Sequence, residues 1–305
     1  MFVLIFHQLV KMLLIMLVAA LCYRIGLINQ EGNRNFSNLL LMVINPCLIL
    51  SVYQTDYDSR LVKGLLISFA AAIAAHLIGI LIARIFISEK YGENYVIERF
   101  GAVYSNCGFI GIPLINSVLG SEGVFYLTAY MTVFNLLSWT HGLGLLKGSF
   151  DIKNLKEGLR SPMVIATFSA MALFFVQIRL PEVVLDSIDY IADMNTPMAM
   201  MVAGFSVAQA DLRSLFKDRS LYRVAFFKLL AVPFAVLVFL KLCPLDDTAA
   251  YTTLIASACP TATTLTMMAI RFQKDYKYAS KIFSLTTILS MVTIPAVIFA
   301  ASYVL

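Results

Sequence analysis

The sequence of 305 residues has few charged residues. Only 13% are Asp, Glu, Lys or Arg, about half the share that is typical of a soluble domain. Hydrophobic residues make up 60%, and the mean hydropathy is +0.83. The chain also lacks long polar stretches between its apolar runs, so that no soluble domain fits between them. These shortages exclude an ordinary water-soluble fold and predict a polytopic membrane protein.

The sequence also lacks the usual signatures of metal, redox and nucleotide chemistry. Its three His and five Cys include no CxxC pair and no Cys/His cluster, which disfavours a metal site and disulfides. It contains no HExxH helix, no GxSxG turn and no nucleotide-binding loop. The net charge of +5 is spread over short loops rather than gathered on one basic domain, so nucleic acid is not an expected partner. We therefore expect no enzyme, no bound cofactor and no metal site.

Ten apolar runs have the length that a bilayer core requires of a helix. They are continuously apolar rather than alternating, which predicts helices and not a barrel. No small-residue cleavage pattern follows the first run, so we expect it to be a span rather than a removed signal peptide. Spans one to ten cover residues 2–23, 36–53, 64–87, 97–119, 124–146, 163–178, 183–207, 224–243, 249–270 and 282–305.

Lys and Arg are distributed unevenly between the connections. Of the 23 Lys and Arg, 17 follow odd-numbered spans and four follow even-numbered ones. Because basic residues concentrate in cytoplasmic loops, we expect a multi-pass protein of the cell membrane with both termini outside the cytoplasm. The other two, Lys11 and Lys228, lie within spans, and we expect both to snorkel toward the nearer membrane surface.

Similar residues recur at an offset of half the chain. Pro46 in span two and Pro197 in span seven are 151 residues apart, and Cys107 in span four and Cys259 in span nine are 152 apart. This offset predicts two five-span halves, 1–150 and 151–305. An odd number of spans in each half requires the halves to have inverted orientations.

Spans four and nine carry helix-breaking residues at matching places. The strings are SNCGFIGIP at 105–113 and SACPTATT at 257–264. Proline lacks an amide hydrogen and clashes with the preceding turn, so we expect Pro113 and Pro260 to break these spans. Paired breaks within a membrane indicate a substrate site, where half-helix N-termini face an anion. For either proline alone, a kink stabilised by hydrogen bonds between helices is the alternative.

The candidate substrate-binding residues are the polar, glycine and proline positions of these strings, joined by polar residues of spans two and seven. They are Asn106, Gly108, Gly111, Pro113, Pro260, Thr261, Thr263, Thr264, Asn45, Asp193 and Asn195. His76 in span three is the candidate for proton coupling because imidazole titrates near physiological pH, and helix packing is its alternative role. The sequence leaves open whether H+, Na+ or neither drives transport.

Four motifs resemble the auxin efflux carrier family of membrane transporters: NP at 45–46, NxGFxGxP at 106–113, NxP at 195–197 and ACPxA at 258–262. The resemblance implies a ten-helix fold similar to that of bile-acid sodium symporters, in which two inverted five-helix repeats bring broken helices four and nine across each other. It also implies a scaffold domain, here 1–53 and 163–207, and a transport domain, here 64–146 and 224–305. Substrates implied by the resemblance are malate-like or auxin-like carboxylates, and a homodimer would form through the scaffold.

We therefore expect an all-α secondary transporter of a small organic anion, surrounded by membrane lipids and working by elevator-type alternating access. Two other classes stay open from the sequence: an intramembrane enzyme and a receptor-like binding protein without transport. The lack of a catalytic motif disfavours the first. The cost of paired broken helices without a ligand disfavours the second.

Overall fold

The computed structural model describes residues 2–149, 153–209, 215–243 and 245–305. In this part of the chain the secondary structure is helical, apart from one isolated antiparallel bridge between Ser105 and Thr261. The expected all-α fold is therefore confirmed. The expected boundary between the two halves, at 150/151, lies outside the described residues.

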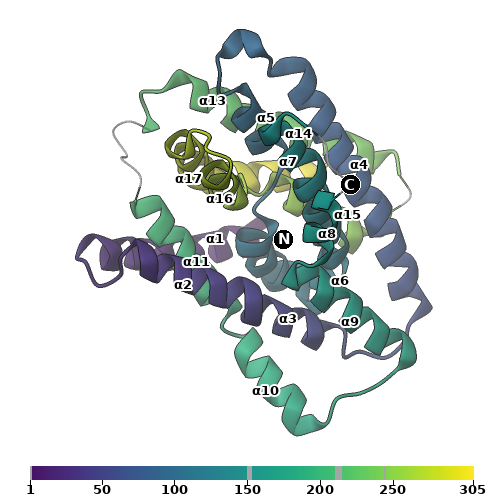
Figure 1. Ribbon diagram of the computed structural model, residues 1–305. Helices are drawn as coiled ribbons and strands as arrows, with labels where there is room; N and C mark the ends of the chain where they lie inside the picture. The colour runs from purple at the N-terminus through teal and green to yellow at the C-terminus, as the bar shows by residue number, and fades with distance from the viewer. Residues whose placement is uncertain (1, 150–152, 210–214, 244) are drawn as a thin grey trace.

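The helices are distributed along the whole described part of the chain (Figure 1). The first part forms α1 (Phe2–Arg24), α2 (Gln30–Leu39), η1 (Leu40–Ile44), α3 (Asn45–Val52), α4 (Ser59–Phe86), η2 (Glu89–Tyr91), α5 (Tyr95–Val103), η3 (Cys107–Gly111), α6 (Ile112–Leu137), η4 (Ser138–Gly142) and α7 (Leu143–Lys147). The second part forms α8 (Lys153–Leu159), α9 (Pro162–Val176), α10 (Glu182–Ala192), α11 (Asn195–Ala208), α13 (Arg219–Phe226), η5 (Phe227–Ala231), α14 (Val232–Lys241), α15 (Asp247–Ala258), α16 (Thr264–Arg271) and α17 (Tyr276–Ala301).

Among the described residues, six continuous helical stretches are long and apolar enough to cross a membrane. The other expected spans consist of shorter helical segments, so the ten-span topology stays a prediction. Residues on the outer face of α1, such as Leu14, Val18 and Leu21, are large, apolar and exposed. Such a surface is stable against lipid and not against water, as a multi-pass membrane protein requires.

Two expected spans differ from continuous helices. Within α6, Gly120 adopts φ 66° and ψ −160°, a conformation that a side chain disfavours, and this kink lies at the expected boundary between spans four and five. Span seven, expected as one helix over 183–207, is instead two helices, because α10 ends at Ala192 and α11 begins at Asn195. Pro197 has no amide hydrogen for the carbonyl of Asp193, which explains the weakness of the helix at this point.

Three other prolines, Pro46, Pro113 and Pro233, are accommodated by widened turns rather than by breaks. The π-helical segments η1, η3 and η5 each end just before the residue that precedes Pro46, Pro113 or Pro233. That preceding residue donates its amide to the carbonyl five residues earlier: Asn45 to Leu40, Ile112 to Cys107, and Val232 to Phe227. The wider turn relieves the clash with the proline ring while the helix continues.

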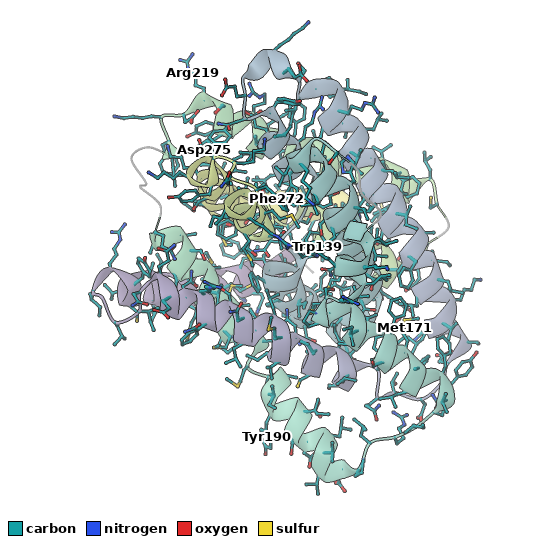
Figure 2. All side chains as sticks on the ribbon, viewed as in Figure 1. Trp139, Met171, Tyr190, Arg219, Phe272 and Asp275 are labelled. Carbon is teal, nitrogen blue, oxygen red and sulfur yellow. The ribbon has the colours of Figure 1, made fainter. Side chains whose placement is uncertain are left out.

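The helices of spans one, two, six and seven pack with one another. Along its length α1 lies against α11, and α3 contacts α9 and α10 (Figure 1). The approach of α1 to α11 is closest at Gly204, where an added Cβ would lie 2.3 Å from the Met16 carbonyl oxygen. Small residues permit such close contact between membrane helices. On the outer side, Tyr190 of α10 extends away from the rest of the protein (Figure 2).

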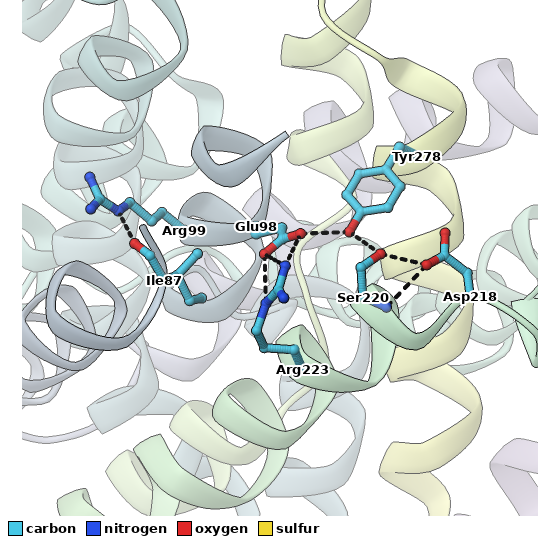
Figure 3. Close-up of polar contacts among 7 residues, drawn as sticks. All are labelled: Ile87, Glu98, Arg99, Asp218, Ser220, Arg223 and Tyr278. Carbon is cyan, nitrogen blue, oxygen red and sulfur yellow. Dashed lines mark hydrogen bonds and ion pairs between the residues drawn. The ribbon is translucent and has the colours of Figure 1, made fainter. Parts of the chain in front are cut away.

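A buried carboxylate joins α5 to α13 and α17 (Figure 3). The side chain of Glu98 in α5 is 2% exposed and accepts hydrogen bonds from Arg223 Nη2 at 2.6 and 2.7 Å and from its Nε at 3.1 Å. Tyr278 of α17 donates to Glu98 Oε1 at 2.8 Å and lies 2.7 Å from Ser220 Oγ. A buried carboxylate is stable only with such donors, so this network holds the half-helix α5 against its neighbours.

Candidate functional site

The interrupted segments of spans four and nine lie against each other and exchange backbone hydrogen bonds. Asn106 N donates to Pro260 O at 2.7 Å, and Ala262 N donates to Tyr104 O at 2.9 Å. These bonds flank the antiparallel bridge between Ser105 and Thr261. Each interruption therefore satisfies backbone groups that the other leaves without a helical partner. We call the segments 104–106 and 259–263, together with the helix ends beside them, the crossover.

The cause of the interruption differs between the two spans. Pro260 breaks span nine as expected: α15 ends at Ala258, and Cys259 adopts the extended conformation, φ −58° and ψ 149°, that precedes a proline. The expectation that Pro113 breaks span four is wrong. There α5 ends at Val103 and the helix resumes at Cys107, six residues before the proline, whose clash is relieved by the wide turn of η3. Pairing with span nine replaces the lost helical hydrogen bonds.

Four helix ends meet at the crossover. The joined helix η3–α6 begins at Cys107, and α16 begins at Thr264. The first amides of each have no acceptor in their own helix, so both N-terminal ends carry partial positive charge. The C-terminal ends of α5 and α15 carry partial negative charge in the same way. The arrangement separates groups that attract an anion from groups that attract a cation.

Three buried asparagines surround the η3 turn. Asn106 is 4% exposed, and its Nδ2 has no hydrogen-bond partner among the described residues. Asn195 Nδ2 donates to Asn45 Oδ1 at 2.6 Å, while Asn45 Nδ2 and Asn195 Oδ1 have no partner in the part of the chain that the structure describes. A Cβ added to Gly108 would lie 3.9 Å from Asn45 Nδ2, so the pair formed by Asn45 and Asn195 faces η3. Each unsatisfied buried amide costs about 1–3 kcal/mol, and a polar ligand would remove that cost.

The candidate residues of span nine divide into two groups. Thr261 has a structural role, because its hydroxyl donates to Gly101 O at 2.8 Å and its amide donates to Thr286 Oγ1 at 3.2 Å. Thr263 is the half-buried N-cap of α16, and the buried Thr264 Oγ1 has no partner within residues 2–149, 153–209, 215–243 and 245–305. Thr264 therefore offers a free hydroxyl at a half-helix N-terminus.

The remaining candidates have different surroundings. Pro113 and Pro260 are buried. A Cβ on Gly111 would lie 3.4 Å from Cys259 Sγ, so this glycine allows span four to pack closely on span nine. Asp193 is the exposed C-cap of α10, and the structure does not bring it into the asparagine cluster. His76 is buried at 2% exposure on α4.

For His76, proton coupling and helix packing both stay predictions. Its Nδ1 lies 2.8 Å from Ala72 O, and since a carbonyl only accepts, this nitrogen carries a proton. Its Nε2 is buried and finds no partner among the residues that the structure describes. The ring lies 4.6 Å, between centroids, from that of Tyr130, whose hydroxyl is 3.5 Å from Ser105 Oγ. The imidazole thus reaches the crossover through Tyr130, and its ring also lies 6.3 Å, between centroids, from that of Tyr104.

Lys228 belongs to the crossover, and the expectation that it snorkels is wrong. It is fully buried, and its Nζ donates to Ser105 Oγ at 2.6 Å and to Ser257 O at 2.8 Å. Its helix begins at Arg219, nine residues earlier and about 14 Å away along the axis, so that Lys228 lies deeper than the apolar run indicated. Two signals were available in the sequence: a charged residue within a span, and the offset of 152 from His76.

The described residues contain no group of three or more His, Cys, Asp or Glu side chains with the spacing of a metal site.

A family model described as "Membrane transport protein" matches residues 4–298. An uncharacterized transporter of Methanocaldococcus jannaschii is 22% identical over 298 residues, which cover 92% of this chain and 94% of that protein. An uncharacterized transporter of Methanothermobacter thermautotrophicus is 24% identical over 292 residues, covering 93% and 94%. The similarity therefore extends over nearly the whole chain.

Proposed function

The chain belongs to the membrane transport protein family, as the auxin-efflux-carrier motifs led us to expect, and from this premise we propose that it is a secondary transporter of a small organic anion. Membership of this family favours transport over the alternatives of an intramembrane enzyme and a receptor-like binding protein. The sequence contains no nucleotide-binding loop. We therefore propose that an ion or substrate gradient supplies the energy.

The observation that carries this proposal is the crossover. Two helix N-termini, at Cys107 and Thr264, meet where Asn106 Nδ2 and Asn45 Nδ2 are buried with no acceptor in the described part of the chain. Amide hydrogens and helix N-termini are the groups that bind a carboxylate. A malate-like or auxin-like carboxylate therefore suits this chemistry, with Asn106, Asn45 and the amides after Cys107 as its hydrogen-bond donors.

The proposed architecture is that of ten spans in two inverted repeats. Packing of α1 on α11 and of α3 on α9 and α10 supports a scaffold made of 1–53 and 163–207. The asparagine pair of the scaffold faces η3 of the proposed transport domain, 64–146 and 224–305, so the substrate would lie between the two domains. We propose that the transport domain moves against the scaffold in an elevator-type cycle, that the scaffold forms the homodimer, and that the protein lies in the cell membrane with both termini outside.

A binding experiment tests the position of the site. Asn106→Ala deletes hydrogen-bonding groups but little apolar packing, so the protein should fold and bind L-malate or indole-3-acetate more weakly. The loss of a hydrogen bond to a charged group costs about 1.5–3 kcal/mol, which corresponds to roughly ten- to a hundredfold in affinity. The matched control is Asn116→Ala, which makes the same substitution at an exposed position of α6. Equal affinities of wild type and Asn106→Ala, measured by calorimetry on folded protein, would place the site elsewhere.

Transport itself is tested by uptake. Purified protein in liposomes should accumulate a labelled carboxylate when an ion or substrate gradient is imposed, and Asn106→Ala should reduce the rate while Asn116→Ala leaves it unchanged. Specific binding without any uptake would favour the receptor-like alternative.

A further inference from the structure

The crossover contains a positive charge, and in the part of the chain that the structure describes no acidic side chain pairs with it. Lys228 lies on η5 and is fully buried. None of the ion pairs among residues 2–149, 153–209, 215–243 and 245–305 includes it. Its ammonium instead donates to Ser257 O, in the last turn of α15, and to Ser105 Oγ, two residues beyond the end of α5. The charge is therefore held between the C-terminal ends of two half-helices.

Such a position is one where a free cation would bind. Helix C-terminal ends carry partial negative charge, and in transporters with broken helices these ends and the unwound carbonyls coordinate the coupling Na+ or H+. In this chain an ammonium attached to α13–α14 through η5 already makes those contacts. We propose that Lys228 is a tethered cation that occupies the position of a free coupling Na+, and that anion binding at the crossover is therefore independent of Na+.

The surroundings of Lys228 support this assignment. Tyr130, whose hydroxyl is 3.5 Å from Ser105 Oγ, and His76, which packs on Tyr130, contribute polar groups without a carboxylate. Two of the three ammonium hydrogens have acceptors, in Ser105 and Ser257. The positive charge adds to that of the two helix N-termini, so an anionic substrate is the counter-charge that the crossover lacks. The inference thus rests on the proposed function, but the cation can be tested without the anion.

The test uses two substitutions of the same residue in the full-length protein. Lys228→Ala removes a side-chain portion equal to n-propylammonium and opens the cation position. Lys228→Met removes the charge but fills most of the same volume, so it is the matched control. Binding of L-malate is measured in NaCl and in choline chloride at equal ionic strength. The unfolding temperature is measured in the same salts, with and without n-propylammonium chloride, in the absence of any organic anion.

Wild type should bind L-malate with affinities that agree within about twofold in the two salts. Lys228→Ala should bind on the order of tenfold or more weakly in choline, because a buried charge next to the anion is gone. Na+ or n-propylammonium should restore part of that affinity and raise the unfolding temperature of Lys228→Ala by roughly 3 °C or more. Lys228→Met should show the same loss without rescue.

Three results would overturn the inference: a requirement of wild type for Na+, wild-type affinity of both variants in choline, or no response of Lys228→Ala to either cation. If Lys228→Ala does not fold, two other measurements decide whether the inference holds. They are the L-malate affinity of wild type in NaCl and in choline chloride, and the L-malate affinity of Lys228→Met. The unfolding measurements contain no organic anion. If cations raise the unfolding temperature of Lys228→Ala in these measurements while Asn106→Ala binds L-malate as tightly as wild type, the tethered cation is retained and the proposed anion site is rejected.

Discussion

The network of Glu98, Arg223 and Tyr278 allows a prediction whose size follows from burial. Arg223→Met removes three of the hydrogen bonds to Glu98 and leaves a carboxylate that is 2% exposed with Tyr278 as its remaining donor in the network of Figure 3. Removing one partner of a buried ion pair costs about 3–5 kcal/mol, because the other charge stays buried without compensation. We expect the free energy of unfolding of the purified protein to fall by that amount.

The control for this prediction is an ion pair at the surface. Arg60 Nη2 lies 3.5 Å from Glu122 Oε2, with the Arg60 side chain 67% exposed, so Arg60→Met should cost less than about 1 kcal/mol. The double variant Glu98→Leu/Arg223→Met removes both charges of this pair and should recover much of the loss. The assay is a denaturant titration in detergent of wild type and the variants. If Arg223→Met cost no more than Arg60→Met, the reasoning about the buried carboxylate would be refuted.

Further predictions concern packing, topology and coupling. Gly204→Ala should destabilise the protein by about 1–3 kcal/mol, since its Cβ would meet the Met16 carbonyl oxygen at 2.3 Å. Gly79→Ala, whose Cβ would meet nothing nearer than 3.6 Å, should be neutral or stabilising by up to about 1 kcal/mol. Thermal unfolding of both glycine variants measures these changes. A reporter that is active only in the cytoplasm should be inactive when fused after Leu305, and strong activity would contradict the ten-span topology. His76→Gln keeps a hydrogen-bonding side chain without its titration, so we expect uptake to lose its dependence on a pH gradient while binding is retained. Unchanged proton-driven uptake in that variant would assign His76 to packing.

The class of the protein and its helical runs could be predicted from the sequence alone. Both depend on composition and on the length of apolar stretches, which the bilayer constrains strongly. The family also followed from local motifs, as the match over residues 4–298 confirms. The asparagines of spans two, four and seven were identifiable because polar residues within a membrane span are rare. These features need no knowledge of which spans are neighbours.

The tertiary structure decided the features that depend on partners distant in the chain. The interruption of span four lies at 104–106 rather than at Pro113, because backbone pairing with 260–262 replaces the helical hydrogen bonds there. Lys228 is buried at the crossover because Ser105 and Ser257, from two other spans, accept from its ammonium. Glu98 is buried because Arg223 and Tyr278 reach it from α13 and α17. In each case the free energy of a polar group in a low-dielectric interior depends on the partner that the fold brings to it, and local sequence does not contain that information.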